Sequence, residues 1–219
     1  METKHARFTT TDGVELSFEV RGEPTSPPLL LLHGFTGSGD DWQHVFDVDA
    51  LAREYLVVRP DARGHGRSAK PAEALTFQRL ALDVIELLGR LGITTTRAIG
   101  MSLGAKTLLH VATAAPDRVE AMVLVSATPR FPEATLATVR GAGAPTDMSF
   151  DAARLGTIRA RVLLVSGDRD PLYPVELAVE LLRGIPSASL YVVPGGGHGP
   201  IFAAEREPFV ARALPFLSR

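Results

Sequence analysis

A serine between two glycines is the strongest chemical signal in the sequence. Ser102 lies in Gly100-Met101-Ser102-Leu103-Gly104, after a β-rich run and before a helical pattern. In that strand–turn–helix setting the glycines allow a tight turn that exposes the serine hydroxyl, and the start of the helix favours negative charge beside it. A chance serine in a glycine-rich turn is the alternative, but the setting favours a nucleophile.

A serine hydroxyl is a weak nucleophile and needs a general base. Of the six histidines, His198 has the best setting, because it follows the last β-rich run within Gly195-Gly196-Gly197-His198-Gly199-Pro200. The flanking glycines leave its imidazole free to reach a cleft at the sheet edge, although a plain loop histidine is the alternative. We expect His110 to be packed or solvated, and His33 and His65 to hold loops in place.

The base in turn needs a carboxylate that orients it. The segment Ser166-Gly167-Asp168-Arg169-Asp170-Pro171 follows a β-rich run and offers two. We favour Asp170, which lies further into the loop and precedes proline. Asp168 is the alternative, and we expect it to close the turn through its backbone.

Acyl transfer also needs N–H donors for the oxyanion of the tetrahedral intermediate. Leu103 offers its backbone N–H immediately after the nucleophile, and Phe35 offers a second one in His33-Gly34-Phe35, at the end of another β-rich run. These two N–H groups are the predicted oxyanion hole. Trp42 is the only tryptophan, and core packing is favoured for it over substrate contact.

The elements that position these residues are short apolar runs. A hairpin is expected from residues 8–11 and 14–20 around Asp12-Gly13. Six runs without polar alternation follow, and continuous hydrophobicity indicates strands buried on both faces of a parallel sheet. They cover 28–32, 55–59, 97–100, 118–125, 161–165 and 189–193.

Helical patterns fill the gaps between these runs. In the clearest one, apolar residues recur at helical spacing from Phe77, with Thr76 as N-cap and with Gly89 and Gly92 marking its end. Further helices are expected at 41–53, 103–114, 175–183 and 208–217. The alternation predicts an α/β fold with a doubly wound, mostly parallel sheet and helices on both faces.

The stretch from Pro129 to Ile158 departs from this rhythm. It is rich in proline, glycine and alanine, with room for one short helix at 133–140. We interpret it as a reduced lid inserted over the carboxyl edge of the sheet. Residues 1–219 are then expected to form a single domain, with 129–158 as its lid.

Composition sets limits on function. The chain has 219 residues, a formal net charge of −2 and no cysteine. A net charge this small gives no indication of binding to nucleic acid or to an acidic membrane. The lack of cysteine excludes disulfides and thiolate catalysis. The N-terminus has no apolar segment typical of a signal peptide, so a cytoplasmic location is the expectation.

Five motifs in this order resemble the α/β-hydrolase fold family along nearly the whole chain. The resemblance implies a central eight-stranded sheet, no cofactor, a triad of Ser102, Asp170 and His198, and oxyanion donors at Phe35 and Leu103. It also implies that Asp61 and the segment 64–68 shape a loop and do no chemistry. The motifs are His33-Gly34-Phe35, Asp61-Ala62-Arg63-Gly64-His65-Gly66-Arg67-Ser68, Gly100-Met101-Ser102-Leu103-Gly104, Gly167-Asp168-Arg169-Asp170 and Gly197-His198.

Within that family the chain is most similar to small serine esterases, enol-lactonases and cofactor-free haloperoxidase-like members. Serine at 102 argues against dehalogenases and epoxide hydrolases, which use an aspartate there. The segment from His33 to Ser38, with Trp42, also resembles the menaquinone-pathway lyase. That group commonly has arginine where this chain has Lys106, which weakens the match.

The expected activity is hydrolysis of carboxylic esters, with short-chain acyl esters or small lactones as substrates and no nucleic acid or membrane partner. The reduced lid predicts a shallow, fairly open site. Thioester hydrolysis, carbon–carbon cleavage and perhydrolysis on the same triad stay open, as does a ligand-binding or signalling homologue, and so does the oligomeric state. Seven residues are predicted from chain position to line the site: Phe35, Arg130, Phe131, Met148, Phe150, Leu172 and Tyr173.

Overall fold

An antiparallel hairpin forms one edge of the sheet, as predicted. In the computed structural model, which describes residues 4–219, β1 (Lys4–Thr9) pairs with β2 (Glu15–Arg21). The turn between them contains Gly13 at φ 87°, a left-handed conformation that glycine adopts without steric cost. The observed strands begin and end within a few residues of the predicted ones.

The remaining strands run parallel to one another. They are β3 (Pro28–Leu32), β4 (Leu56–Pro60), β5 (Thr96–Met101), β6 (Val119–Val125), β7 (Arg161–Gly167) and β8 (Ala188–Val193). The eight-stranded sheet has the order β1-β2-β4-β3-β5-β6-β7-β8, with β2 antiparallel to β4. The predicted fold, a mostly parallel α/β sheet, is therefore confirmed.

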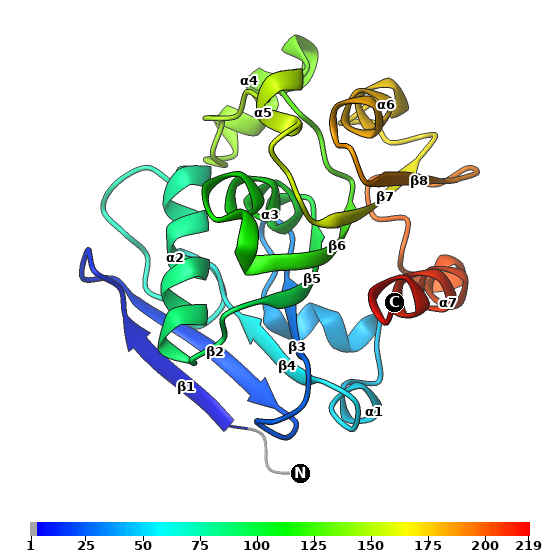
Figure 1. Ribbon diagram of the computed structural model, residues 1–219. Helices are drawn as coiled ribbons and strands as arrows, with labels where there is room; N and C mark the ends of the chain where they lie inside the picture. Colours follow the sequence, from blue (N-terminus) through cyan, green and yellow to red (C-terminus); the bar gives the residue numbers. More distant parts are fainter. Residues whose placement is uncertain (1–3) are drawn as a thin grey trace.

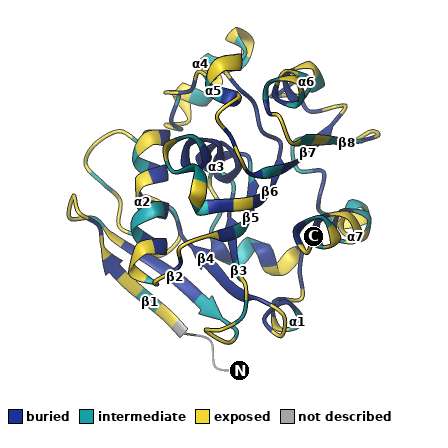
Figure 2. Ribbon diagram, in the orientation of Figure 1, coloured by how far each residue is buried: buried dark blue, intermediate teal, exposed yellow. Residues whose placement is uncertain are grey.

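The continuous apolar runs are explained by two cores, one on each face of the sheet. Within β3, Leu30 and Leu32 pack into one core, whereas Leu29 and Leu31 pack into the other. The first core lies under α2 (Phe77–Arg90) and α3 (Leu103–Ala114), and the second lies under α1 (Val48–Leu51) and α7 (Arg206–Leu217). Figure 1 shows these helix pairs on opposite faces, and Figure 2 shows the buried strands between them.

The single helix predicted at 41–53 is wrong. The chain forms a 3₁₀ helix, η1 (Gly39–His44), and then the short α1. Each piece has its own N-cap, because the Ser38 hydroxyl accepts an N–H bond at the start of η1 and the Asp47 carboxylate does so at the start of α1. The 3₁₀ helices η2 (Pro116–Arg118) and η3 (Ala203–Glu205) were also not predicted.

The segment predicted as a lid contains two helices. The expected one is α4 (Glu133–Gly141), and α5 (Ala152–Leu155), which Asp151 caps, was missed. α5 contacts α6 (Val175–Gly184), and all three helices are drawn at the top of Figure 1. Within residues 4–219, no helix combines the length and the apolar character that a membrane crossing requires.

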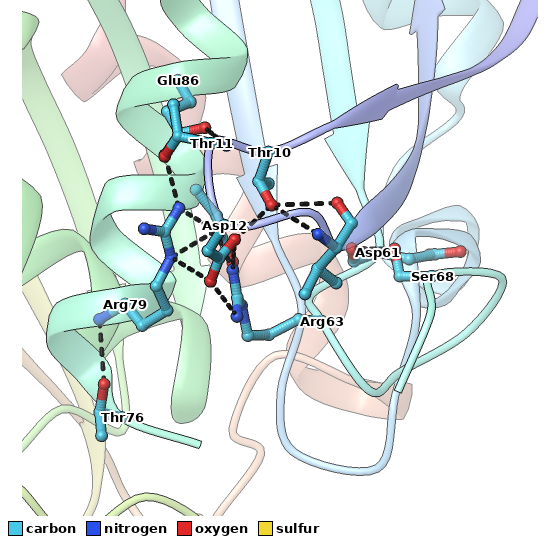
Figure 3. Close-up of polar contacts among 11 residues, drawn as sticks. Thr10, Thr11, Asp12, Asp61, Arg63, Ser68, Thr76, Arg79 and Glu86 are labelled. Carbon is cyan, nitrogen blue, oxygen red and sulfur yellow. Dashed lines mark hydrogen bonds and ion pairs between the residues drawn. The ribbon is translucent and has the colours of Figure 1, made fainter. Parts of the chain in front are cut away.

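A cluster of charges ties the hairpin turn to α2 and to the loop that follows β4. The buried Arg63 binds Asp83 through two hydrogen bonds of 2.6 Å and binds Asp12 through bonds of 3.0 and 3.1 Å. Figure 3 shows Arg79 beside the same Asp12, where it also binds Glu86 at 2.5 Å. Paired charges of this kind are costly to break when buried, so the cluster fixes the loop that begins at Asp61.

Candidate active site

Ser102 lies at a sharp turn between β5 and α3. Its backbone has φ 48° and ψ −102°, a left-handed conformation rare outside glycine. The two flanking glycines permit the close packing that this turn requires. A Cβ added to Gly100 would come within 2.6 Å of the Gly104 carbonyl, and one added to Gly104 would come within 2.2 Å of the Leu32 carbonyl oxygen.

The structure brings Ser102, His198 and Asp170 into one hydrogen-bonded chain. The Ser102 Oγ lies 2.9 Å from His198 Nε2, and His198 Nδ1 lies 2.8 Å from Asp170 Oδ2. With Nδ1–H donating to the carboxylate, Nε2 is free to accept the serine proton. This is the geometry that a serine nucleophile and its base need.

Asp170 is held as an anion. Its side chain is fully buried, and its other oxygen accepts backbone N–H bonds from Leu172 at 2.8 Å and Tyr173 at 3.1 Å. Burial works to raise the pKa of Asp170, but the hydrogen bond from His198 and the two N–H donors outweigh it and hold that pKa below its ordinary value.

Asp168, the alternative acid, has a different place. Its Oδ1 accepts the Gly195 N–H at 2.6 Å, which joins the loop after β7 to the loop after β8. The same two loops meet through the Arg169 N–H, which donates to the Gly196 carbonyl at 2.9 Å. The contact is so close that a Cβ on Gly167 would lie 2.1 Å from the Gly196 oxygen.

The predicted oxyanion donors lie at the mouth of the same site. Leu103 is the first residue of α3, and an N–H at that position has no acceptor inside the helix. Phe35 lies in the loop after β3, and both residues line the cavity that contains Ser102.

His33 and His65 hold the loop that carries Phe35. The His33 Nδ1–H donates to the Gly34 carbonyl at 2.7 Å, and its Nε2 accepts the Ala62 N–H at 3.0 Å. Burial lowers the pKa of His33, which keeps the ring neutral in this bridging role. His65 packs its ring against Phe35, with ring centres 5.3 Å apart.

A cavity of about 240 Å³ opens beside Ser102 and His198. Of the seven residues predicted to line it, Phe35, Phe131, Leu172 and Tyr173 do so. The lid contributes five further lining residues that the sequence analysis missed: Thr138, Val139, Ala142, Ala144 and Pro145. The sequence signal that could have identified these residues was their position on an apolar face of α4 and in the proline-containing turn after it.

The prediction is wrong for Arg130, Met148 and Phe150. Arg130 forms a bridge with Ser149 that turns its side chain outward, where it pairs with Glu180 at 2.6 Å. Met148 and Phe150 belong to the core under α3 and do not line the cavity. Because side chains alternate along an extended segment, Phe131 points into the cavity while its neighbour Arg130 points outward.

Lys106 lies in the cavity wall and was not among the predicted lining residues. Its Nζ donates to the Tyr173 hydroxyl at 2.8 Å, and it lies 4.4 Å from the centre of the Tyr173 ring and 5.2 Å from that of Phe131. Burial lowers the pKa of Lys106 to about 7, opposed only in part by the charge of Asp170. The available signal was its position one helical turn after Ser102.

Two family models match the chain. A family model described as alpha/beta hydrolase fold matches residues 27–154, and one described as TAP-like protein matches residues 142–209. The chain is 38% identical over 119 residues to an sn-1-specific diacylglycerol lipase of Xenopus tropicalis, a match that covers 53% of this chain and 36% of that one. It is 35% identical over 131 residues to epoxide hydrolase A of Mycobacterium tuberculosis, covering 58% of this chain and 40% of that one.

Among solved structures, a carboxylesterase from Bacillus subtilis superposes with a TM-score of 0.84 at 22% identity, covering 99% of this chain and 92% of that one. At that identity the likeness concerns the fold. The matches to the first four curated relatives span only 29% to 44% of those relatives' lengths. The match to residues 27–154, however, covers more than half of this chain and includes Ser102. The protein therefore belongs to the α/β-hydrolase fold family.

Proposed function

We propose that the chain is a carboxylic-ester hydrolase that acts through an acyl-enzyme on Ser102. The observation that carries this proposal is the continuous hydrogen-bonded chain from the Ser102 hydroxyl through His198 to the buried Asp170 carboxylate. It opens on an apolar cavity, where a bound acyl group and the attacking oxygen would meet.

The mechanism follows from the protonation states. His198 Nε2 accepts the Ser102 proton as the oxygen attacks the ester carbonyl, and the imidazolium that forms is stabilised by Asp170. The N–H groups of Phe35 and Leu103 receive the oxyanion. His198 then returns the proton to the leaving alcohol, and a water activated by the same imidazole releases the acyl group.

Cavity size supports small substrates. A volume of about 240 Å³ suits a short acyl ester or a small lactone rather than a long lipid chain. The apolar lining from Phe35, Phe131 and Leu172 fits a short aliphatic or cyclic acyl part. The lipase among the similar proteins supports ester chemistry.

A p-nitrophenyl ester series from acetate to octanoate, run with wild type and Ser102→Ala, tests the proposal. We expect the highest kcat/KM at short chain lengths and a loss in kcat of at least about a thousandfold in Ser102→Ala, since the residual rate comes only from the oxyanion hole and binding. Ser189→Ala, at an exposed position on β8, is the matched control and keeps wild-type turnover.

Activity retained in Ser102→Ala would mean that another group performs the attack. Acetyl-CoA hydrolysis and peracid formation, measured in parallel, separate ester cleavage from the other reactions that the same triad supports. A fully folded enzyme without turnover of any of these substrates would contradict the proposed function.

A further inference from the structure

The cavity contains a cation that the proposed ester chemistry does not use. Lys106 is only 3% exposed, and among the described residues the Tyr173 hydroxyl is the one hydrogen-bond acceptor its Nζ contacts. An ammonium group carries three donors, so two have no hydrogen-bond partner in the described part of the chain. Burying such a group without acceptors is costly, and that cost singles it out as a candidate for binding a ligand.

Its position relative to the nucleophile is fixed by the helix. Lys106 lies four residues after Ser102, the N-cap of α3, and its backbone N–H donates to the Ser102 carbonyl at 3.0 Å, so about one helical turn separates the two residues. Both line the same cavity. A group bound at Nζ would therefore belong to the same molecule that Ser102 attacks.

The surroundings of Lys106 are apolar apart from residues of the loops after β7 and β8, which carry Asp170 and His198. Phe77 from α2 and Phe131 from the lid present their rings to Nζ, at 5.8 and 5.2 Å from the ring centres. The charged or titratable groups that face it are Tyr173, Asp170 and His198, from the loops after β7 and β8. Asp170 is already engaged by His198 and two backbone N–H groups, so within residues 4–219 no free carboxylate pairs with the amine.

We propose that Lys106 is a specificity residue that binds a carboxylate on the acyl part of the substrate, so that the preferred esters are monoesters of short dicarboxylic acids. This inference rests on the proposed ester function. The acyl part is the favoured location, because it stays attached to Ser102 through both steps of the reaction while the alcohol leaves. A charge-assisted bond from Nζ would then hold the substrate in the ground state and in both transition states.

Two esters of equal acyl length test the proposal: monomethyl glutarate, which carries a terminal carboxylate, and methyl valerate, which ends in a methyl group. Hydrolysis is followed by pH-stat titration. For wild type we expect kcat/KM to be at least about tenfold higher for monomethyl glutarate, as a charged hydrogen bond allows, with the difference mainly in KM.

In Lys106→Met, and independently in Lys106→Gln, that preference is lost, and the ratio of the two kcat/KM values falls by at least about tenfold. The glutamine variant retains amide N–H donors for Tyr173 but has no charge, so it separates the ammonium from the packing of the side chain. Lys70→Met is the matched control, because Lys70 is exposed and does not line this cavity. It keeps the wild-type ratio.

Binding without turnover gives a second readout. Glutarate is titrated calorimetrically into Ser102→Ala in buffers of different ionisation enthalpy. With a pKa of about 7, the Lys106 amine is mostly neutral at pH 8, and an anion beside it raises that pKa. Binding should therefore take up a proton at pH 8, and the affinity should fall as pH rises above 7. Proton uptake that persists after Lys106→Met would contradict the assignment of the bound proton to Lys106.

The outcomes separate the two proposals. Equal hydrolysis of both esters, with no glutarate binding and no effect of either Lys106 variant on the ratio, overturns the carboxylate site and leaves the ester hydrolase standing. Hydrolysis of neither ester, combined with Lys106-dependent binding of glutarate and proton uptake, supports the site and contradicts the proposed function.

Discussion

At the scale of single residues, two aspartates in one loop have separable roles. Asp170 accepts the His198 Nδ1–H, whereas Asp168 accepts a backbone N–H and closes the loop. Both were candidates in the sequence because both follow the same strand. Only the fold decides which carboxylate faces the imidazole, and their different contacts make the pair a matched test.

Asp170→Asn should lower kcat by about ten-thousandfold, because an amide at this position favours the wrong imidazole tautomer. Asp168→Asn should leave kcat close to that of wild type while lowering thermal stability. Both are measured with p-nitrophenyl acetate, and circular dichroism confirms folding. A larger loss of kcat in Asp168→Asn than in Asp170→Asn would reverse the assignment of the acid.

Sequence patterns indicated the site residues that follow strands. They did not indicate which side chains of the irregular segments line the cavity. Ser102, His198 and Asp170 each lie just past a strand with a clear apolar pattern, so their convergence at one sheet edge was predictable. Arg130 and Phe150 lie in the lid, where no period fixes which side chains point inward, and both predictions were wrong. Lys106 was missed because a lysine in a helix is ordinarily exposed.

At the scale of elements, the prediction of secondary structure succeeded for strands with a clear apolar pattern and failed in an irregular segment. β3 was predicted at its observed bounds, since its apolar run is continuous and Leu29 to Leu32 are buried. The segment 41–53 was assigned to one helix from composition, but Ser38 and Asp47 each start a separate short helix. Capping side chains act locally, and an averaged hydrophobic pattern does not detect them.

His110 joins three elements and gives a prediction about stability. On α3, its ring stacks on Phe77 of α2, with centres 5.6 Å apart, and meets the edge of Phe150 at 4.8 Å. Burial, together with the nearby charge of Arg154, lowers the pKa of His110 to about 4. The folded protein therefore holds this imidazole neutral at pH values where the unfolded chain, with a histidine pKa of ~6.5, binds a proton.

Because the unfolded state binds more protons between those two pKa values, this residue makes stability fall as pH drops from about 6.5 towards 4. In urea unfolding, the free energy of unfolding should fall by about 2 kcal/mol less in His110→Phe than in wild type when the pH drops from 7 to 5. His44→Phe, at an exposed histidine, is the control and should keep the wild-type difference. An unchanged pH dependence in His110→Phe would mean that His110 does not titrate in this way.

At the scale of the whole molecule, we propose that residues 1–219 form one domain with 129–158 as its lid. The two cores lie on opposite faces of one sheet and share its strands, so neither has a framework of its own. The lid contributes Phe131 and Phe150 to the core under α3 and contributes α4 to the cavity wall.

Unfolding should therefore be a single cooperative transition. Trp42, the only tryptophan, is buried in the core under α1 and α7, and its fluorescence reports on that face. Far-ultraviolet circular dichroism reports on all helices, including α2 and α3 on the other face. We expect the two signals to give the same urea midpoint. Midpoints that differ reproducibly would divide the chain into separately folding parts.

The backbone contact between Gly167 and Gly196 has a consequence for motion. It joins the loop that carries the acid to the loop that carries the base, and the second loop is also bound to the end of β6, where the Ser126 hydroxyl donates to the His198 carbonyl at 3.2 Å. The Ser102 N–H donates to the Val125 carbonyl at 2.8 Å, so the nucleophile is joined to the end of the same strand. Any displacement of the loop after β8 would therefore change the Ser102–His198 and His198–Asp170 distances together.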